Sequence, residues 1–436
     1  MSKLALLGGE KAVKDSSNLV ASVPLVPEKA YPVINDMLKK GEISTSPVVE
    51  EFEDRFKKYI GAKYALTVPN GTTSIMTALF AAGIQPGDEV IVPSFTFWAS
   101  AGPIAAINAV PVFADVDLLS HNMTAEFIEK KITDKTKAII IVHVWGTPAE
   151  LDPIIALSKK YNLKLIEDCS HAHGATYHGK KVGMFGDIGC FSLQGSKTLP
   201  AGEGGILVTN NREMFERACA LGHYERLASL GEGSNYSKYS LTGFGFKHRI
   251  HPVAAAIANA GLDTLDELNA LRNKNAKYLE ALINDLEYIT VQKTAFQSER
   301  SYSYHFVKYN PEKLLGINLN TVLKAISAEG VTCGSCGYGK LHKAPFYTEK
   351  GPYDNCFPFG EAYIPSSDLH NTEILSETVF MIAPRFETQC DEHIKQYALA
   401  YHKILENAEE LKKYELDNNL SDVKITNKGR SINLYN

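Results

Sequence analysis

Apolar and polar positions alternate in blocks along the first half of the chain, and the blocks predict strands separated by helices. The predicted strands cover residues 64–68, 87–93, 110–114, 138–143, 164–166, 188–193 and 206–209. The predicted helices between them cover residues 72–82, 97–108, 126–132, 151–161 and 213–221. Strands that alternate with helices at this pace favour βαβ crossovers. We therefore expect an α/β fold whose large domain holds a mainly parallel sheet.

The second half of the chain follows a different pattern. Residues 252–286 predict a long helical region with a break near Gly261, an element that can connect two domains. Beyond it, short strands at 303–310 and 331–335 and helices at 320–329 and 390–411 indicate a smaller α+β domain. We predict an N-terminal arm (1–29), a large domain (30–265), a small C-terminal domain (266–412) and a polar tail (413–436).

Polar residues follow two of the predicted strands directly. Asp168 comes just after the strand at 164–166, and Ser192 and Lys197 lie at and just beyond the end of the strand at 188–193. Because ligands of parallel α/β sheets bind outside the carboxyl ends of the strands, these three residues are candidates for a single site. Taken one at a time, Asp168 could equally be a helix cap, and Lys197 could be a surface lysine.

A third candidate element is the sequence Asn70-Gly71-Thr72-Thr73-Ser74, which opens a helix directly after a strand. Backbone N–H groups and hydroxyls at the positive end of a helix dipole bind anions, phosphate in particular. The alternative is an ordinary N-cap with a turn. The pattern GxxxxGK[ST] is absent, and no GxGxxG follows a strand, which disfavours nucleotide and dinucleotide binding.

Together these residues form the set that pyridoxal phosphate (PLP) requires. An amine forms the Schiff base, a carboxylate keeps the pyridine nitrogen protonated, and hydroxyls with a helix N-terminus hold the phosphate. A competing hypothesis is a metal-dependent hydrolase that uses the His-rich loop 167–178. That loop contains Glu167, Asp168, His171, His173 and His178, but its spacing fits no familiar metal signature.

Composition disfavours a nucleic-acid-binding protein, a membrane protein and a cysteine-based site. The 436 residues are 44% apolar with a net charge of −5, which is typical of a globular protein and gives no electrostatic footprint for nucleic acid. No apolar run approaches about 18 residues, so we expect a soluble, cytoplasmic protein that does not enter a membrane. The pair Cys333 and Cys336 in TCGSC has no second CxxC, which disfavours a metal or disulfide site there.

Several longer motifs appear in a fixed order. They are NGTTSIMTAL, PGDEVIVPSFTFWASAGPIAAINAVPVFADVD, LIEDCSHAHGATYHGKKVG, GDIGCFSLQGSKTLPAGEGGILVTN and GFKHRIHPVAAAIA. In these the chain resembles the DegT/StrS sugar aminotransferases, which are fold-type I PLP-dependent transferases. The resemblance covers roughly residues 30–385. It implies PLP as cofactor, with a large PLP-binding domain and a smaller C-terminal α+β domain.

The resemblance also implies roles for individual residues. Lys197 would be the catalytic Schiff-base lysine, and Asp168 the partner of the pyridine nitrogen. The remaining cofactor contacts it implies are Gly71, Thr72, Thr73 and Ser192 at the phosphate, His171 near the phenolic oxygen, and Phe97 stacked on the ring. Many members carry Asn where this chain has Lys247 in GFKHRI, a position that reaches the phosphate of the neighbouring subunit. No metal is implied.

The activity implied is transfer of an amino group from glutamate or glutamine to a ketone. The acceptor would be a keto-sugar or keto-cyclitol, for aminosugar, aminocyclitol, surface-polysaccharide or antibiotic biosynthesis. The resemblance also implies a homodimer with shared active sites. Relatives that dehydrate sugars carry His in place of the lysine, so Lys197 favours transamination over a PLP-dependent sugar dehydratase or a regulatory PLP protein.

Overall fold

The computed structural model describes residues 2–14, 25–231, 233–349 and 369–421. Its centre is a seven-stranded sheet in the order β1-β9-β8-β5-β4-β2-β3. The strands are β1 (Tyr64–Val68), β2 (Glu89–Pro93), β3 (Val110–Ala114), β4 (Thr136–Val142), β5 (Lys164–Asp168), β8 (Ile188–Ser192) and β9 (Gly205–Thr209). Strand β9 runs antiparallel to both of its neighbours, and the other pairings are parallel. The prediction of a mainly parallel sheet is confirmed.

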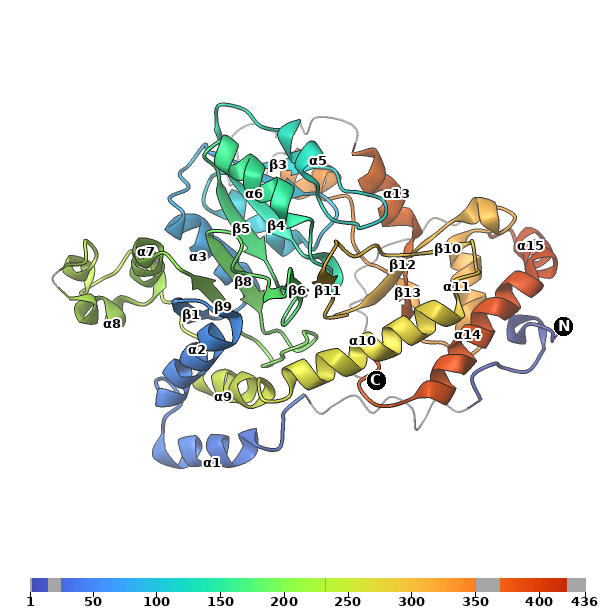
Figure 1. Cartoon of the computed structure of the whole chain (residues 1–436), viewed down its shortest axis with the longest axis horizontal. Helices are drawn as coiled ribbons and strands as arrows, with labels where there is room; N and C mark the ends of the chain where they lie inside the picture. The colour runs from blue at the N-terminus through green and yellow to red at the C-terminus, as the bar shows by residue number, and fades with distance from the viewer. Residues whose placement is uncertain (1, 15–24, 232, 350–368, 422–436) are drawn as a thin grey trace.

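Helices cover this sheet on both faces (Figure 1). They include α2 (Pro47–Ile60), α3 (Gly71–Ala81), α4 (Gly102–Ala106), α5 (Ala125–Glu129), α6 (Leu151–Lys160) and α7 (Arg212–Gly222). Helix α3 packs against β8, β9 and α7, whereas α6 packs against β5 and α5. Because helices lie on both faces, the central strands are largely apolar, and Ile139, Ile140 and Ile141 of β4 are completely buried.

One predicted helix, at 97–108, is divided in the structure. A short 3₁₀ turn, Trp98–Ser100, precedes α4. Pro103 lies in the first turn of α4, where its missing N–H costs nothing; inside a continuous helix it would remove a hydrogen bond. The proline therefore begins a new helix, and the preceding turn leaves Ser100 close to the end of β5.

The helical region predicted at 252–286 consists of α9 (Pro252–Gly261) and α10 (Leu265–Leu282), with the expected break after Gly261. Helix α10 runs from the large sheet to a second, antiparallel sheet in the order β10-β12-β14-β13 (Figure 1). Its strands are β10 (Ile289–Val291), β12 (His305–Tyr309), β13 (Gly334–Ser335) and β14 (Val379–Ala383). Strand β14, with the continuous apolar sequence VFMIA, is not among the predicted strands.

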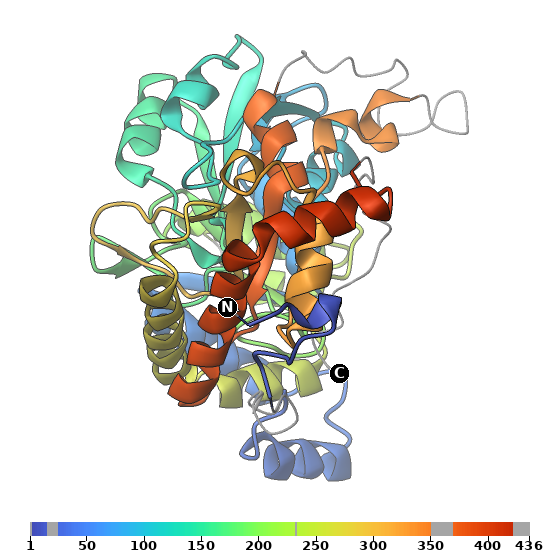
Figure 2. The same ribbon diagram turned by 90° about the vertical axis from the view of Figure 1, so that its right-hand side faces the viewer.

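The second sheet shares a hydrophobic core with helices α11 (Leu319–Ala328), α14 (Asp391–Glu406) and α15 (Ala408–Asp417). The N-terminal segment crosses this helical layer (Figure 2). There, the carboxylate of Glu329 accepts hydrogen bonds from the backbone N–H groups of Ala5 and Ala12. No helix in the described part of the chain is both long and apolar enough to span a membrane. The four-part domain division stays a prediction.

Candidate active site

The carboxyl ends of β5 and β8 bring the predicted residues together. The two strands are parallel neighbours, with Asp168 opposite Cys190. Asp168 is therefore the last residue of β5 at the edge where Ser192 ends β8. Lys197 follows in the connection from β8 to β9, which turns tightly because the Lys197 N–H donates to the Gln194 carbonyl at 2.8 Å. The sheet topology thus places an acid, a hydroxyl and an amine at the same edge of the sheet, where ligands of such folds bind.

Asp168 is held in a fixed orientation. Its Oδ2 accepts a 2.7 Å hydrogen bond from the hydroxyl of Ser100, and its Oδ1 accepts from the backbone N–H of Ser170 at 3.0 Å. The carboxylate is 96% buried, since its residue exposure is 4%. A buried carboxylate needs such donors. Each of its two oxygens still has a lone pair that can accept a further hydrogen bond, for example from a protonated ring nitrogen.

The N-terminus of α3 lies directly against the end of β8. A Cβ placed on Gly71 would lie 2.6 Å from the Cβ of Ser192, so only glycine permits this approach. Asn70 caps the helix by accepting from the backbone N–H and the hydroxyl of Thr73. The side chain of Thr72 makes no hydrogen bond within the described part of the chain. The motif is therefore both an N-cap and a junction of N–H groups with the Ser192 hydroxyl, which is suited to phosphate.

Glycine is also required at the first residue of β9, Gly205, which lies against the cap of α3. A Cβ on Gly205 would lie 2.4 Å from the carbonyl oxygen of Asn70. Gly205 begins β9 and pairs with both Val68 and Ser192. The GEGG sequence thus lets β9 lie between the other two strands without pushing the α3 cap away.

Lys197 is half-buried, and its Nζ forms no hydrogen bond or ion pair with the residues that the structure describes. Burial lowers the pKa of this amine, and the charge of Arg385 acts in the same direction, whereas Tyr304 and Asp168 oppose the shift. A lysine with a lowered pKa supplies more neutral amine near neutral pH than a surface lysine does. This is the property that imine formation with an aldehyde requires.

His171 is buried and neutral. Burial lowers its pKa well below the usual value, and the nearby charge of Lys197 adds to the effect. Its Nδ1 accepts from the backbone N–H of Trp145 at 3.3 Å, which assigns the proton to Nε2. The rings of Tyr304 and Tyr338 flank it at 5.5 and 6.5 Å between centroids. The predicted residue is thus a fixed hydrogen-bond donor.

Two predicted cofactor contacts, Phe97 and Lys247, make no hydrogen bond or ion pair with the other candidate residues in the part of the chain that the structure describes. Phe97 is 48% exposed and packs on Trp98. Lys247 is exposed on the segment between α7 and α9. Their roles toward the cofactor remain predictions.

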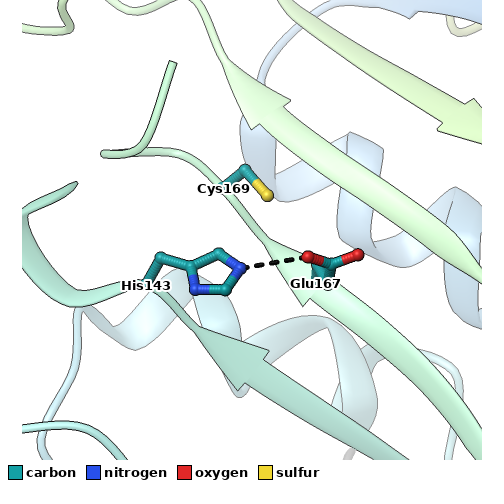
Figure 3. Close-up of side chains that lie close together, drawn as sticks. All are labelled: His143, Glu167 and Cys169. Atoms are coloured by element: carbon teal, nitrogen blue, oxygen red, sulfur yellow. Dashed lines mark hydrogen bonds and ion pairs between the residues drawn. The ribbon is translucent and has the colours of Figure 1, made fainter. Parts of the chain in front are cut away.

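The residues of the hypothetical metal loop point to different places. His178 bonds Gln297 and Asp152 on the surface, and His173 bonds Thr198. A different group does come together: His143, Glu167 and Cys169 place possible ligand atoms within 4.8 Å of one another (Figure 3).

This group is already complete without an ion. Glu167 Oε1 accepts from the N–H groups of Phe185 and Gly186, and Oε2 accepts from the Gly183 N–H and from His143 Nε2. The Nδ1 of His143 accepts from Ala149 N–H, so Nε2 carries the proton. A metal would have to displace these donors. The donor set therefore fits a structural network rather than a metal centre.

Sequence reasoning missed Ser100, Trp145 and Tyr304. Ser100 lies in a 3₁₀ turn, and Trp145 has an unusual φ of 54°. Tyr304 directly precedes β12 of the second sheet, more than 100 residues after Lys197 in the sequence. Ser100 and Tyr304 do not directly follow a strand of the large sheet, so the pattern that found Asp168 and Lys197 gives no signal for them. Trp145 lies three residues beyond the end of β4, but an apolar ring at that place carries no sign of acid, base or phosphate chemistry.

The site meets the chemical demands of PLP: a carboxylate for the ring nitrogen, an amine with a lowered pKa, and a helix N-terminus with hydroxyls for the phosphate. The fold agrees. An aminotransferase from Psychrobacter cryohalolentis superposes with a TM-score of 0.80 at 28% identity, over 88% of this chain and 98% of that one. The protein is a PLP-dependent aminotransferase.

Its family follows from the sequence match. Residues 26–368 match the DegT/DnrJ/EryC1/StrS aminotransferase family, and the chain belongs to it. A putative L-glutamine:3-amino-2,3-dideoxy-scyllo-inosose aminotransferase from Micromonospora echinospora is 36% identical over 296 residues, 67% of this chain and 70% of that protein. A GDP-perosamine synthase from Escherichia coli O157:H7 is 39% identical over 261 residues, 59% of this chain and 69% of that one. The expected fold, cofactor and reaction class are confirmed.

Proposed function

We propose that this aminotransferase moves an amino group from glutamine or glutamate to the ketone of a keto-sugar or keto-cyclitol. The names of its relatives support both acceptor classes, because one name contains an inosose as acceptor and the other gives a nucleotide-linked aminosugar as product. The product would enter aminosugar, aminocyclitol, surface-polysaccharide or antibiotic biosynthesis. The observation that carries this proposal is that Lys197 and Asp168 lie at the same sheet edge of an aminotransferase fold, near enough for the charge of Asp168 to act on the pKa of the lysine.

The residues divide the work by their chemistry. When bound, PLP supplies an electron sink for the substrate carbon. Asp168 would hold the proton of the ring nitrogen, and the N–H of His171 would face the phenolic oxygen. Gly71, Thr72, Thr73 and Ser192 would hold the phosphate. Lys197 would anchor the cofactor and then, as a neutral amine, move a proton from the α-carbon of the donor. Phe97 would cover the ring.

The proposal includes a homodimer that shares its active sites. Large apolar side chains are exposed on the segment between α7 and α9, where Leu241 is 88% and Phe246 is 53% exposed beside Lys247. A second copy would cover them and receive Lys247 at its phosphate, where the lysine adds a full positive charge. Sedimentation of the purified protein tests this part directly, and a monomer that turns over at full rate would exclude it.

Lys197 also separates this proposal from its alternatives. A sugar dehydratase of the same family would need a base other than an amine at this position, and a regulatory PLP protein would have no need of a poised lysine and acid together. The metal-dependent hydrolase is not retained, because all four acceptor positions of the Glu167 carboxylate are already used.

The decisive experiment is an absorption spectrum of the purified protein with PLP, followed by a donor and then an acceptor. We expect a near-visible band that glutamine or glutamate bleaches and that one ketone restores. The acceptor panel should contain inososes, free and phosphorylated keto-sugars, and nucleotide-linked keto-sugars. A band that no amino donor bleaches would overturn the proposed transamination.

A further inference from the structure

The loop that carries Lys197 is bound to a tyrosine from the small-domain side of the chain. Tyr304 immediately precedes β12, and its hydroxyl donates to the Oγ of Ser196 at 3.1 Å. Ser196 is the neighbour of Lys197 in sequence. Tyr304 also influences the pKa of Lys197 and packs edge-on against His171. A residue more than 100 positions away thus contacts the lysine loop and the ring beside it.

From Ser196 the hydrogen bonds continue toward the phosphate side of the site. Its Oγ donates to Oε1 of Gln194 at 2.6 Å, and its N–H donates to the same oxygen at 2.8 Å. The N–H of Gln194 in turn donates to Oγ of Ser192 at 3.3 Å. Ser192 is the hydroxyl that lies against Gly71 at the N-terminus of α3.

The same glutamine fixes the backbone of the lysine. Its carbonyl accepts from the N–H of Lys197 at 2.8 Å. A shift of Gln194 therefore changes both the Ser192 hydrogen bond and the place from which the Lys197 side chain starts. Hydrogen bonds linked in this way act as a unit, because moving one member changes the geometry of the next.

We propose that Tyr304, Ser196 and Gln194 form a relay that couples occupation of the phosphate cradle to the placement of Lys197. A phosphate bound at Ser192 would order Gln194 and hold the amine in the position from which it reacts. Tyr304 is a positioning residue in this relay, since it acts through Ser196. Its hydrogen bond fixes the lysine loop to the segment before β12. This inference rests on the proposed roles of Lys197 and Ser192.

The test compares PLP with pyridoxal, the same aldehyde without its phosphate, as ligands of cofactor-free full-length protein. The readout is the dissociation constant of pyridoxal divided by that of PLP. Both constants are measured from the absorbance of the ring linked to the lysine. General damage to the lysine site weakens both ligands alike and leaves the ratio unchanged. Loss of the relay lowers the ratio, because the phosphate then no longer helps to place the amine.

We expect Tyr304→Phe to lower the ratio about 2- to 10-fold, the value of one hydrogen bond. Ser196→Ala should lower it at least as much, because it also removes the hydrogen bond from Ser196 to Gln194. The double variant should fall no further than Ser196→Ala alone, because Ser196→Ala already removes the bond that Tyr304→Phe removes. Tyr309→Phe is the matched control: its hydroxyl donates to the Ile317 carbonyl, away from the lysine loop. It should leave the ratio at the wild-type value.

Three results would overturn the relay. They are an unchanged ratio in both single variants, an additive fall in the double variant, and an equal fall in Tyr309→Phe. Failure of the proposed function looks different, because the wild-type protein would then form no lysine-linked chromophore with either ligand.

Discussion

The hydroxyl of Ser100 donates a 2.7 Å hydrogen bond to Oδ2 of Asp168, across 68 positions of sequence. It is a charge-assisted bond to a buried carboxylate, which is stronger than a bond between neutral groups. Ser100→Ala leaves that oxygen without its donor and lets the carboxylate turn. We expect the rate at which the amino donor bleaches the bound cofactor to fall about 10-fold.

The matched control for that variant is Ser158→Ala, whose hydroxyl bonds the Ile155 carbonyl within α6. Its bleaching rate should stay at the wild-type value. Stopped-flow absorbance with glutamine measures both variants. An unchanged rate in Ser100→Ala would show that the backbone N–H of Ser170 alone orients Asp168.

Replacing Lys197 should remove turnover without unfolding the protein. Its Nζ has no hydrogen-bond partner within the described residues, so Lys197→Ala breaks no native contact of that kind. We expect complete loss of the transfer reaction and of the lysine-linked absorbance band, and no fall in the melting temperature of the cofactor-free protein. Lys159→Ala, at an exposed position of α6, should keep both. Turnover at the wild-type rate in Lys197→Ala would refute its assignment.

The pH dependence of cofactor capture should reflect the lowered pKa of Lys197. Burial stabilises the neutral amine, so the capture rate in the cofactor-free protein should reach its midpoint below the ordinary lysine value of 10.5. Between the folded pKa and 10.5 the unfolded chain binds the proton more readily. The cofactor-free protein should therefore lose stability as the pH falls through that window. A midpoint at or above the ordinary value would contradict the burial of this amine.

Gly71→Ala should damage the phosphate cradle. The new methyl group would overlap the side chain of Ser192, and one of the two elements must move. We expect a loss of about 1–3 kcal/mol in unfolding free energy, typical of overpacking, and weaker binding of PLP. Gly233→Ala serves as the control, because no atom lies within 4 Å of a Cβ there. Chemical denaturation and a PLP titration check the two effects.

Glu167→Gln should destabilise the fold rather than the chemistry. The carboxylate accepts four hydrogen bonds, and an amide would direct two N–H groups at other N–H donors. We expect about 1–3 kcal/mol less unfolding free energy in urea. Exposed Glu126→Gln, which breaks only a surface pair with Lys130, should change it little. If bound metal were the real function of this group, chelators would destabilise the wild-type protein to a similar extent.

The sequence by itself determined the architecture of the large domain and the central members of the site. Periodicity predicted the strands of the parallel sheet, and the rule that ligands bind at carboxyl ends selected Asp168, Ser192 and Lys197. The parallel sheet is confirmed, because periodicity depends on local order along the chain, and the roles of the three residues stay predictions. Motif resemblance then supplied the cofactor and the reaction class.

Only the tertiary structure decided what surrounds those residues. Ser100 reaches Asp168, and Tyr304 reaches Ser196, by contacts between elements far apart in sequence. The same holds for Glu167: its sequence neighbours left a metal loop as an alternative, but His143 and three backbone N–H groups from residues 183–186 saturate its oxygens. Hydrogen-bond satisfaction depends on which donors folding brings near, and no local pattern encodes that.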